Sequence, residues 1–186
     1  MDLGLQGKHA IVTGGSRGIG KALEHMAREL GYYFSPSQLT TFLETYRYHY
    51  AASGTPYTRP YPGVTTTLQA LSSLTFGVVT TKAQEQAEIV LRQLQLSAFF
   101  RHVQGWMPGL QLKPAPDTVV AALTALRCAP QQALMVGDTP ADILAGKAAV
   151  LKTCAVTYGF GTLEELRRCE PDYVIDTFAD LTTLLR

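Results

Sequence analysis

Residues 133–149 of the chain, "ALMVGDTPADILAGKAA", hold the pattern that decides the fold. A short apolar run leads to Gly137 and Asp138, and the helical pattern that follows begins at Ala141. The run does not alternate between polar and apolar residues, which is typical of a strand buried on both faces of a parallel sheet. A second carboxylate, Asp142, follows one helical turn after Asp138. The stretch therefore predicts a buried strand that delivers two aspartates at its carboxyl end.

On either side of this stretch, short apolar segments alternate with segments of helical periodicity. The segments expected to be strands are 8–13, 76–81, 102–106, 133–138, 153–159 and 173–176. The segments expected to be helices are 19–31 (ending at Gly31), one begun by Ser35 or Ser37, 65–73, 84–94, 115–126, 141–149 and 163–168. This alternation predicts an α/β fold, a three-layer Rossmann-like parallel sheet with helices on both faces.

The composition narrows the function classes. The chain has 186 residues, 46% of them hydrophobic, and a formal net charge of +1. No basic stripe points to nucleic acid, and no apolar run approaches the roughly 18 residues of a membrane span. Three widely spaced cysteines and the lack of a signal-peptide pattern favour a cytoplasmic protein with reduced thiols. Its expected partner is a small molecule.

Polar side chains follow the expected strands at the edge where ligands bind in such sheets. Hydroxyl groups come from Thr13, Thr80 and Thr81, a cation from Lys113, and carboxylates from Asp138 and Asp142, while the strand 153–159 ends in Tyr158, Gly159 and Phe160, followed by Gly161. Hydroxyls, backbone amides and lysine bind phosphate oxygens, and carboxylates bind hard divalent cations. Taken singly, each residue is more typical of a strand end, a turn or a helix cap than of a functional site. Together they predict a site for a phosphate group and a cation.

Residues 59–186 resemble the haloacid dehalogenase-like hydrolases of the phosphoglycolate phosphatase type. The resemblance rests on "RPYPGVTTTLQAL", "GVVTTKAQ", "LQLKPAPD", "MVGDTPADILAGKAA" and "AVTYGFG". It implies magnesium-dependent hydrolysis of a small phosphate monoester. Thr80 and Lys113 would hold the phosphoryl group, Lys113 would also steady the charged nucleophile, Asp138 would ligate Mg²⁺, and Asp142 would support that metal site.

Two departures from this family matter. Its nucleophile motif, D-x-D-x-T at the end of the first strand, is missing: no aspartate stands between Asp2 and Asp117, and "HAIV" is followed by "TGGSRGIG". Without that carboxylate the usual covalent intermediate cannot form, so we expect hydrolysis to be impaired or lost. The other departure is Val150, where the family usually has a glycine that ends the helix in a left-handed conformation, so a local loss of stability is expected.

Residues 1–22, "MDLGLQGKHAIVTGGSRGIGKA", resemble the opening of the short-chain dehydrogenases/reductases. The resemblance implies a phosphate- or cofactor-binding loop made of Thr13, Gly14, Gly15, Ser16, Arg17, Gly18, Ile19 and Gly20. Arg17 would favour NADP over NAD. The Y-x-x-x-K pair that such a reductase needs is absent, because no lysine has a tyrosine four positions before it. A working dehydrogenase is therefore not expected.

The two resemblances together suggest a chimera with three parts. Residues 1–31 would be a dehydrogenase-like strand, glycine loop and helix that completes the core sheet. Residues 32–60, with a proline-rich stretch near their end, would be a helical cap remnant and hinge, and residues 61–186 the hydrolase-like core. Three interpretations stay open: an impaired phosphatase, a module that binds NADP or another phosphate compound through the glycine loop, and a catalytically silent scaffold.

Overall fold

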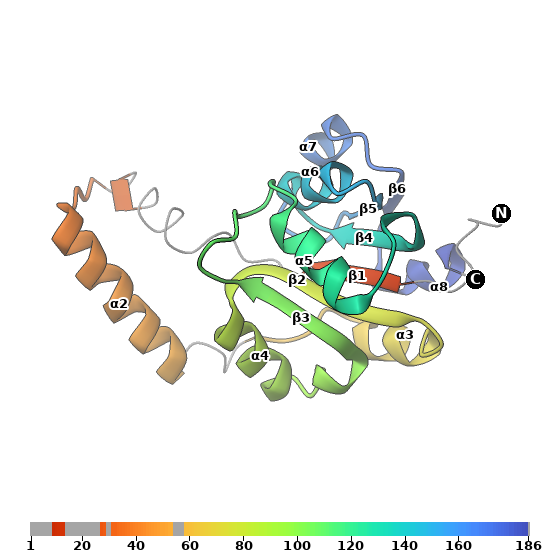
Figure 1. Ribbon diagram of the computed structural model, residues 1–186, viewed down its shortest axis with the longest axis horizontal. Helices are drawn as coiled ribbons and strands as arrows, with labels where there is room; N and C mark the ends of the chain where they lie inside the picture. The colour runs from red at the N-terminus through yellow and green to blue at the C-terminus, as the bar shows by residue number, and fades with distance from the viewer. Residues whose placement is uncertain (1–8, 14–26, 29–30, 54–57, 186) are drawn as a thin grey trace.

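The computed structural model describes residues 9–13, 27, 28, 31–53 and 58–185 (Figure 1). Within these residues, six parallel strands form one sheet in the order β3-β2-β1-β4-β5-β6. The strands are β1 (His9–Thr13), β2 (Thr75–Ala83), β3 (Phe100–Trp106), β4 (Ala133–Gly137), β5 (Lys152–Val156) and β6 (Tyr173–Ile175). The predicted Rossmann-like parallel sheet is confirmed.

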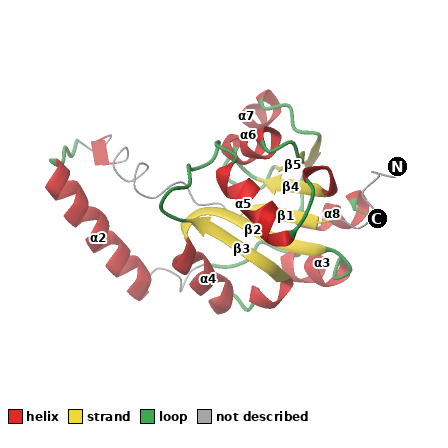
Figure 2. Ribbon diagram, in the orientation of Figure 1, coloured by secondary structure: helices red, strands yellow, loops and turns green. Residues whose placement is uncertain are grey.

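Helices cover both faces of this sheet, as Figure 2 shows. They are α3 (Val64–Ala70), α4 (Gln84–Gln93), α5 (Asp117–Leu126), α6 (Pro140–Ala148), α7 (Leu163–Arg168) and α8 (Leu181–Leu184). A further helix, α2 (Pro36–Ser53), lies to one side of the sheet (Figure 1). One apolar layer joins the sheet to α3 and α8, with the leucines of α4 and its C-cap at its edge, and the other joins it to α5 and α6. All five residues of β4 are buried, which explains why that strand has no polar alternation.

The N-terminal strand lies in the middle of the sheet. β1 pairs in parallel with β2 on one side and with β4 on the other. Its first residue, His9, is the register partner of Thr75 and of Ala133, and its last residue, Thr13, is the partner of Val79. The segment that resembles a dehydrogenase therefore supplies the central strand of the hydrolase-like sheet.

Two helix boundaries follow the sequence signals. Gly31 has a φ of 85° and donates its N–H to the carbonyl of Arg28, while the N–H of Tyr32 reaches the carbonyl of Ala27. This pair of bonds is a Schellman motif, so the predicted helix end at Gly31 is confirmed. Ser35, not Ser37, begins α2: its Oγ accepts from the N–H of Gln38 at 3.4 Å, and the Gln38 side chain accepts from the N–H of Ser35 at 2.9 Å.

Val150 occupies the left-handed conformation that the sequence predicted for its position. Its φ is 63°, and its N–H donates to the carbonyl of Lys147 while the N–H of Leu151 donates to that of Gly146. A β-branched residue is strained there because its side chain crowds the following carbonyl. Val150 is also 67% exposed, so apolar burial does little to offset this cost.

Some elements differ from the sequence-based prediction. The strand expected over 153–159 stops at Val156, because the following residues turn back onto Asp138. β3 begins at Phe100, two residues before the expected start, and a short 3₁₀ helix and α8 close the chain beyond Thr177, where no helix was predicted. Most of the helix expected over 19–31, and the glycine loop before it, lie outside the described residues.

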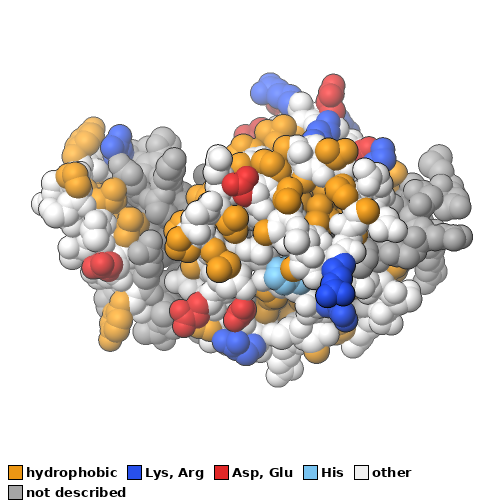
Figure 3. Space-filling view, viewed as in Figure 1, with side chains coloured by type: hydrophobic (Ala, Val, Ile, Leu, Met, Phe, Trp, Pro, Cys, Tyr) orange, Lys and Arg blue, Asp and Glu red, His pale blue; other side chains and the backbone are white. Residues whose placement is uncertain are grey.

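The face shown in Figure 3 has no large patch of only positive or only negative side chains among the described residues. Lysine and arginine side chains lie among acidic ones and between apolar patches. No helix among the described residues has the length and hydropathy that a membrane-spanning segment requires.

Candidate functional site

The candidate site lies beyond the carboxyl ends of the central strands. From β1 the chain progresses outward through β2 and β3 on one side and through β4, β5 and β6 on the other. Ligands of doubly wound sheets bind where the strand order reverses in this way, here between β1 and β4. Thr13 ends β1, Gly137 ends β4, and Asp138 follows directly.

Lys113 reaches this edge from the segment before α5. Its Nζ lies 2.5 Å from Oδ1 of Asp142 and 3.4 Å from the carbonyl oxygen of Val79, and its side chain is only 4% exposed. A buried cation needs such partners, because leaving water is costly for an unpaired charge. The ion pair holds the ammonium group beside Val79 of β2, at the level where β1 ends.

Asp142 has two structural tasks at once. Its Oδ1 receives Lys113, while its Oδ2 accepts hydrogen bonds from the N–H (3.0 Å) and the hydroxyl (2.7 Å) of Thr139. Thr139 in turn caps α6, and the two residues form a capping box. Both carboxylate oxygens of Asp142 are therefore already engaged by protein donors.

Asp138 is held by the loop that follows β5. The N–H of Phe160 donates to Oδ2 of Asp138 at 3.0 Å, and the N–H of Gly161 donates to its backbone carbonyl at 2.9 Å. A Cβ atom at Gly159 would lie 2.2 Å from the Cβ of Asp138, so only glycine fits there. Burial raises the pKa of the Asp138 carboxyl, and the hydrogen bond from Phe160 opposes that rise.

The two threonines of β2 lie next to the Lys113 contact. Thr80 is buried and follows Val79, the residue whose carbonyl faces Lys113. Its Oγ1 accepts a hydrogen bond from the N–H of Lys82 at 3.2 Å. Thr81 follows and is half-buried. The fold thus brings Thr80, Lys113 and Asp142 to one edge of the sheet, as the sequence suggested, together with Asp138 at the end of β4.

Thr13 ends β1 and is the register partner of Val79, so its backbone lies beside the same contact of Lys113. The other residues of the expected glycine loop, Gly14, Gly15, Ser16, Arg17, Gly18, Ile19 and Gly20, lie outside the described residues. The place where a nucleophilic carboxylate was expected is therefore fixed by the backbone of β1, and threonine stands there.

The donor set is a poor match for magnesium. Mg²⁺ prefers six oxygen ligands, of which proteins usually supply one or two carboxylates. Asp142 is committed to Lys113 and Thr139, which leaves Asp138 as the one acidic candidate at this edge. Among residues 9–13, 27, 28, 31–53 and 58–185, no group of three His, Cys, Asp or Glu side chains could hold a metal ion. We therefore derive no catalytic step through a metal.

The loop around Asp138 was only partly foreseen. The sequence placed Tyr158, Gly159 and Phe160 at the ligand edge without giving them a role. Two glycines flanking an aromatic residue directly after a strand were the available signal for a close backbone approach. Tyr61, whose ring centre lies 4.8 Å from that of Tyr158, was not predicted at the site.

The amino-acid sequence is similar to those of known phosphatases. The chain is 37% identical to a phosphoglycolate phosphatase of Aquifex aeolicus over 146 residues, 77% of this chain and 67% of that protein. It is 34% identical to the pyrophosphatase PpaX of Anoxybacillus flavithermus over 152 residues, 81% of this chain and 71% of that protein. These relatives lend no support to NADP binding.

The fold and the family agree with this similarity. A haloacid dehalogenase-like hydrolase from Streptococcus pneumoniae superposes with a TM-score of 0.80 and 23% identity, covering 96% of this chain and 98% of the other. The family model described as haloacid dehalogenase-like hydrolase matches residues 14–156, beginning directly after β1. The chain therefore belongs to the haloacid dehalogenase-like hydrolase family.

Proposed function

We propose that this protein binds the phosphoryl group of a small phosphorylated molecule at the carboxyl ends of β1, β2 and β4, and that it hydrolyses phosphate monoesters slowly or not at all. The relatives named above are a phosphoglycolate phosphatase and a pyrophosphatase, which supports a phosphate-containing ligand. The lack of an aspartate between Asp2 and Asp117 supports the loss of hydrolysis.

The observation that carries the proposal is the position of Lys113. Its ammonium group contacts the carbonyl of Val79, and Val79 is the register partner of Thr13. A nucleophile at the end of β1 would therefore lie near a buried cation able to stabilise its charge and that of a phosphoryl group. The sequence has threonine at this position, which lacks the carboxylate that forms the covalent intermediate.

In this proposal each retained residue binds rather than reacts. Lys113 neutralises the phosphoryl charge, Thr80 and Thr81 supply hydroxyl donors, and Asp142 holds Lys113 in place. Asp138 is the carboxylate that a cation arriving with the substrate would meet. Magnesium dependence stays a family expectation, and the pattern of donors around Asp142 argues for weak metal affinity.

The missing nucleophile motif has an origin in the N-terminal segment. We infer that residues 1–31 are a dehydrogenase-like segment that completes the sheet, followed by a shortened cap and hinge over 32–60 and the hydrolase core over 61–186. A parallel strand at the centre of the sheet is common to both families, so β1 can pair with β2 and β4 although it brings no nucleophile.

The test is to restore the missing motif. Thr13→Asp combined with Gly15→Asp recreates D-x-D at the end of β1, and we expect it to raise hydrolysis of p-nitrophenyl phosphate by roughly 100-fold or more. The matched control, Thr13→Asn with Gly15→Asn, has the same shape without the negative charge and should stay at the starting rate. Ordinary phosphatase turnover by the unmodified chain, abolished by Lys113→Met, would contradict the proposal.

A further inference from the structure

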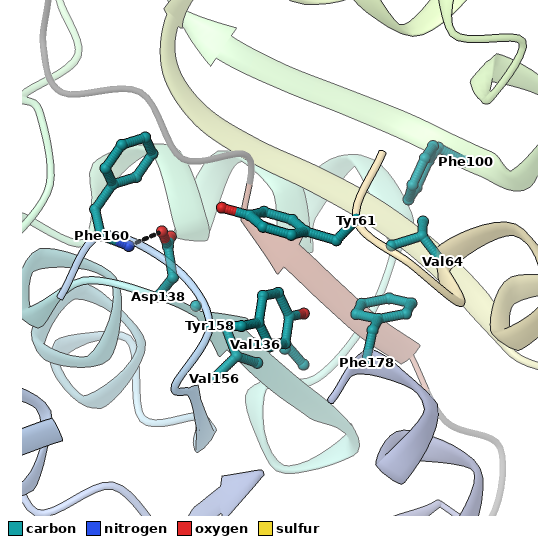
Figure 4. Close-up of a pocket in the computed structure, with 10 residues that line it drawn as sticks. Tyr61, Val64, Phe100, Val136, Asp138, Val156, Tyr158, Phe160 and Phe178 are labelled. Atoms are coloured by element: carbon teal, nitrogen blue, oxygen red, sulfur yellow. Dashed lines mark hydrogen bonds between the residues drawn. The ribbon is translucent and has the colours of Figure 1, made fainter. Parts of the chain in front are cut away.

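A cavity of about 130 Å³ opens beside Asp138, on the face of the sheet that α3 and α8 cover. Its walls are rich in aromatic rings, contributed by Tyr61, Phe100, Tyr158, Phe160 and Phe178 (Figure 4). These residues come from the hinge before α3, the start of β3, the loop after β5 and the segment after β6. The rings thus come from four parts of the chain, and Val136, Gly137 and Asp138 add a fifth at the end of β4.

The cavity has a buried apolar floor and an exposed rim. Phe178, Val136 and Val156 are nearly fully buried and form its base, whereas Tyr61 is 47% exposed and Phe160 is 65% exposed. The rings of Tyr61 and Tyr158 meet edge to face at 61°, with their centres 4.8 Å apart. In Figure 4 the hydroxyl end of Tyr61 is directed toward Asp138. The exposed parts of Tyr61 and Phe160 mark the side on which a small ligand could enter.

The described residues that line the cavity carry charge of one sign. They include one carboxylate, Asp138, and no lysine, arginine or histidine. Burial, and then the negative charge of Asp138, raise the pKa of the Tyr158 hydroxyl well above its usual value, so that ring stays neutral. The charge of Lys113 reaches Asp138 and acts to lower its pKa, but Lys113 is not among the described residues that line the cavity. A ligand carboxylate in the cavity would therefore meet the Asp138 carboxylate as its charged neighbour.

We propose that this cavity binds an organic ammonium group. The faces of aromatic rings attract cations, and the attraction grows when the site excludes water, which the buried floor favours. The Asp138 carboxylate adds charge complementarity at the rim. A quaternary ammonium group suits the volume and needs no hydrogen-bond acceptors on the apolar floor, unlike a primary ammonium group.

This site is separate from the contact of Lys113. The lysine pairs with Asp142, and neither residue lines the cavity. Asp138 belongs to both places, since it follows β4 at the ligand edge and also borders the cavity. The ammonium site therefore does not depend on whether the chain hydrolyses phosphate esters.

A matched pair of ligands tests the proposal. Choline and 3,3-dimethylbutan-1-ol have the same shape and differ in the replacement of the charged nitrogen by carbon. Titrating the full chain with each, followed by NMR, should show choline binding at least about 10-fold more tightly than the alcohol. Equal affinities would mean an apolar pocket without charge preference and would overturn the proposal. Failure of choline to bind at about 50 mM would do the same.

Two variants localise the binding. Tyr61→Leu at the exposed rim should weaken choline binding about 5-fold or more, whereas Tyr48→Leu, also exposed but on α2, should leave it unchanged. Asp138→Asn should abolish the preference for choline over the alcohol, while Asp176→Asn, a carboxylate outside the cavity, should keep it. Choline binding that survives both cavity variants would place the ligand elsewhere and refute the assignment.

Discussion

The ammonium group of Lys113 lies 2.5 Å from the Asp142 carboxylate, and the two side chains are 4% and 3% exposed. The two residues are separated by 29 positions in the chain and come from different segments, the loop before α5 and the first turn of α6. Their pairing joins those segments at the ligand edge of the sheet. It also fixes the cation that the proposed phosphoryl site requires.

Lys113→Met tests the structural value of this pair. Removing one partner leaves an uncompensated buried charge, which typically costs about 3–5 kcal/mol in the free energy of unfolding. Denaturant titration measures the loss. The control is Arg168→Met, which breaks an exposed i,i+4 pair with Glu164 and should cost at most about 0.5 kcal/mol. Similar losses in the two variants would show that the buried pair is not specially stabilising.

Val150→Gly should stabilise the protein. The φ of 63° strains a β-branched side chain, whereas glycine adopts it freely, so we expect a gain of about 1 kcal/mol after the entropy cost of glycine. Thermal unfolding of the variant should shift to higher temperature. Val120 lies on the exposed side of α5, inside a helix, where glycine is unfavourable. Val120→Gly should therefore lower the free energy of unfolding by about 1 kcal/mol. A loss of stability in Val150→Gly would refute the strain argument.

Gly159→Ala should disrupt the packing of the loop after β5 against Asp138. The added methyl group would lie 2.2 Å from the Asp138 Cβ and 2.3 Å from its Oδ2, so the loop or the carboxylate must move. We expect a loss of about 1–3 kcal/mol in unfolding free energy and a faster amide exchange at Phe160, whose N–H holds Asp138. Phe160→Ala keeps that N–H and should retain its protection. Unchanged exchange in Gly159→Ala would contradict the close packing.

Asp172 gives the chain a defined acid sensitivity. Desolvation acts to raise its pKa, but hydrogen bonds from Lys152 (2.6 Å) and Thr153 (2.9 Å) outweigh it and hold the pKa below 3.8. A lowered folded-state pKa stabilises the fold above the unfolded value, and this stabilisation is lost as the pH falls through the folded value. Asp172→Asn should therefore cost about 1 kcal/mol at pH 7, discounted for partial exposure. Urea unfolding at several pH values should show the difference from the unmodified chain shrinking below about pH 4. A difference independent of pH would exclude the charge as its source.

The fold could be predicted almost completely from the sequence. Apolar strands such as 133–137 and helices such as 163–168 carry strong local signals, because burial on two faces and capping boxes both depend on neighbouring residues. The left-handed conformation of Val150 was implied by the family resemblance, because the family usually has a helix-ending glycine at this position. The end of β5 was misplaced because a tertiary contact with Asp138 overrides the apolar pattern beyond Val156.

The candidate site was predictable as a set of residues but not as a network. Thr80 and Asp138 could be named from their places at strand ends, Lys113 from the segment before a helix, and Asp142 from its place one helical turn after Asp138. The sequence could not predict that Lys113 and Thr139 engage both oxygens of Asp142. Hydrogen-bond partners far apart in the chain leave no periodic signal. The aromatic cavity was missed for the same reason, since its rings come from four separate segments.

The sequence by itself determined the class of fold, the family resemblance and the loss of the nucleophile, because these depend on local pattern and on which residue types are present. The tertiary structure alone decided that β1 lies between β2 and β4, that Thr13 is the register partner of Val79, whose carbonyl contacts Lys113, and that Gly159 packs against Asp138. These relations arise from strand pairing and close packing between distant segments. A sequence lists the groups that can react, but only folding fixes the distances on which binding and catalysis depend.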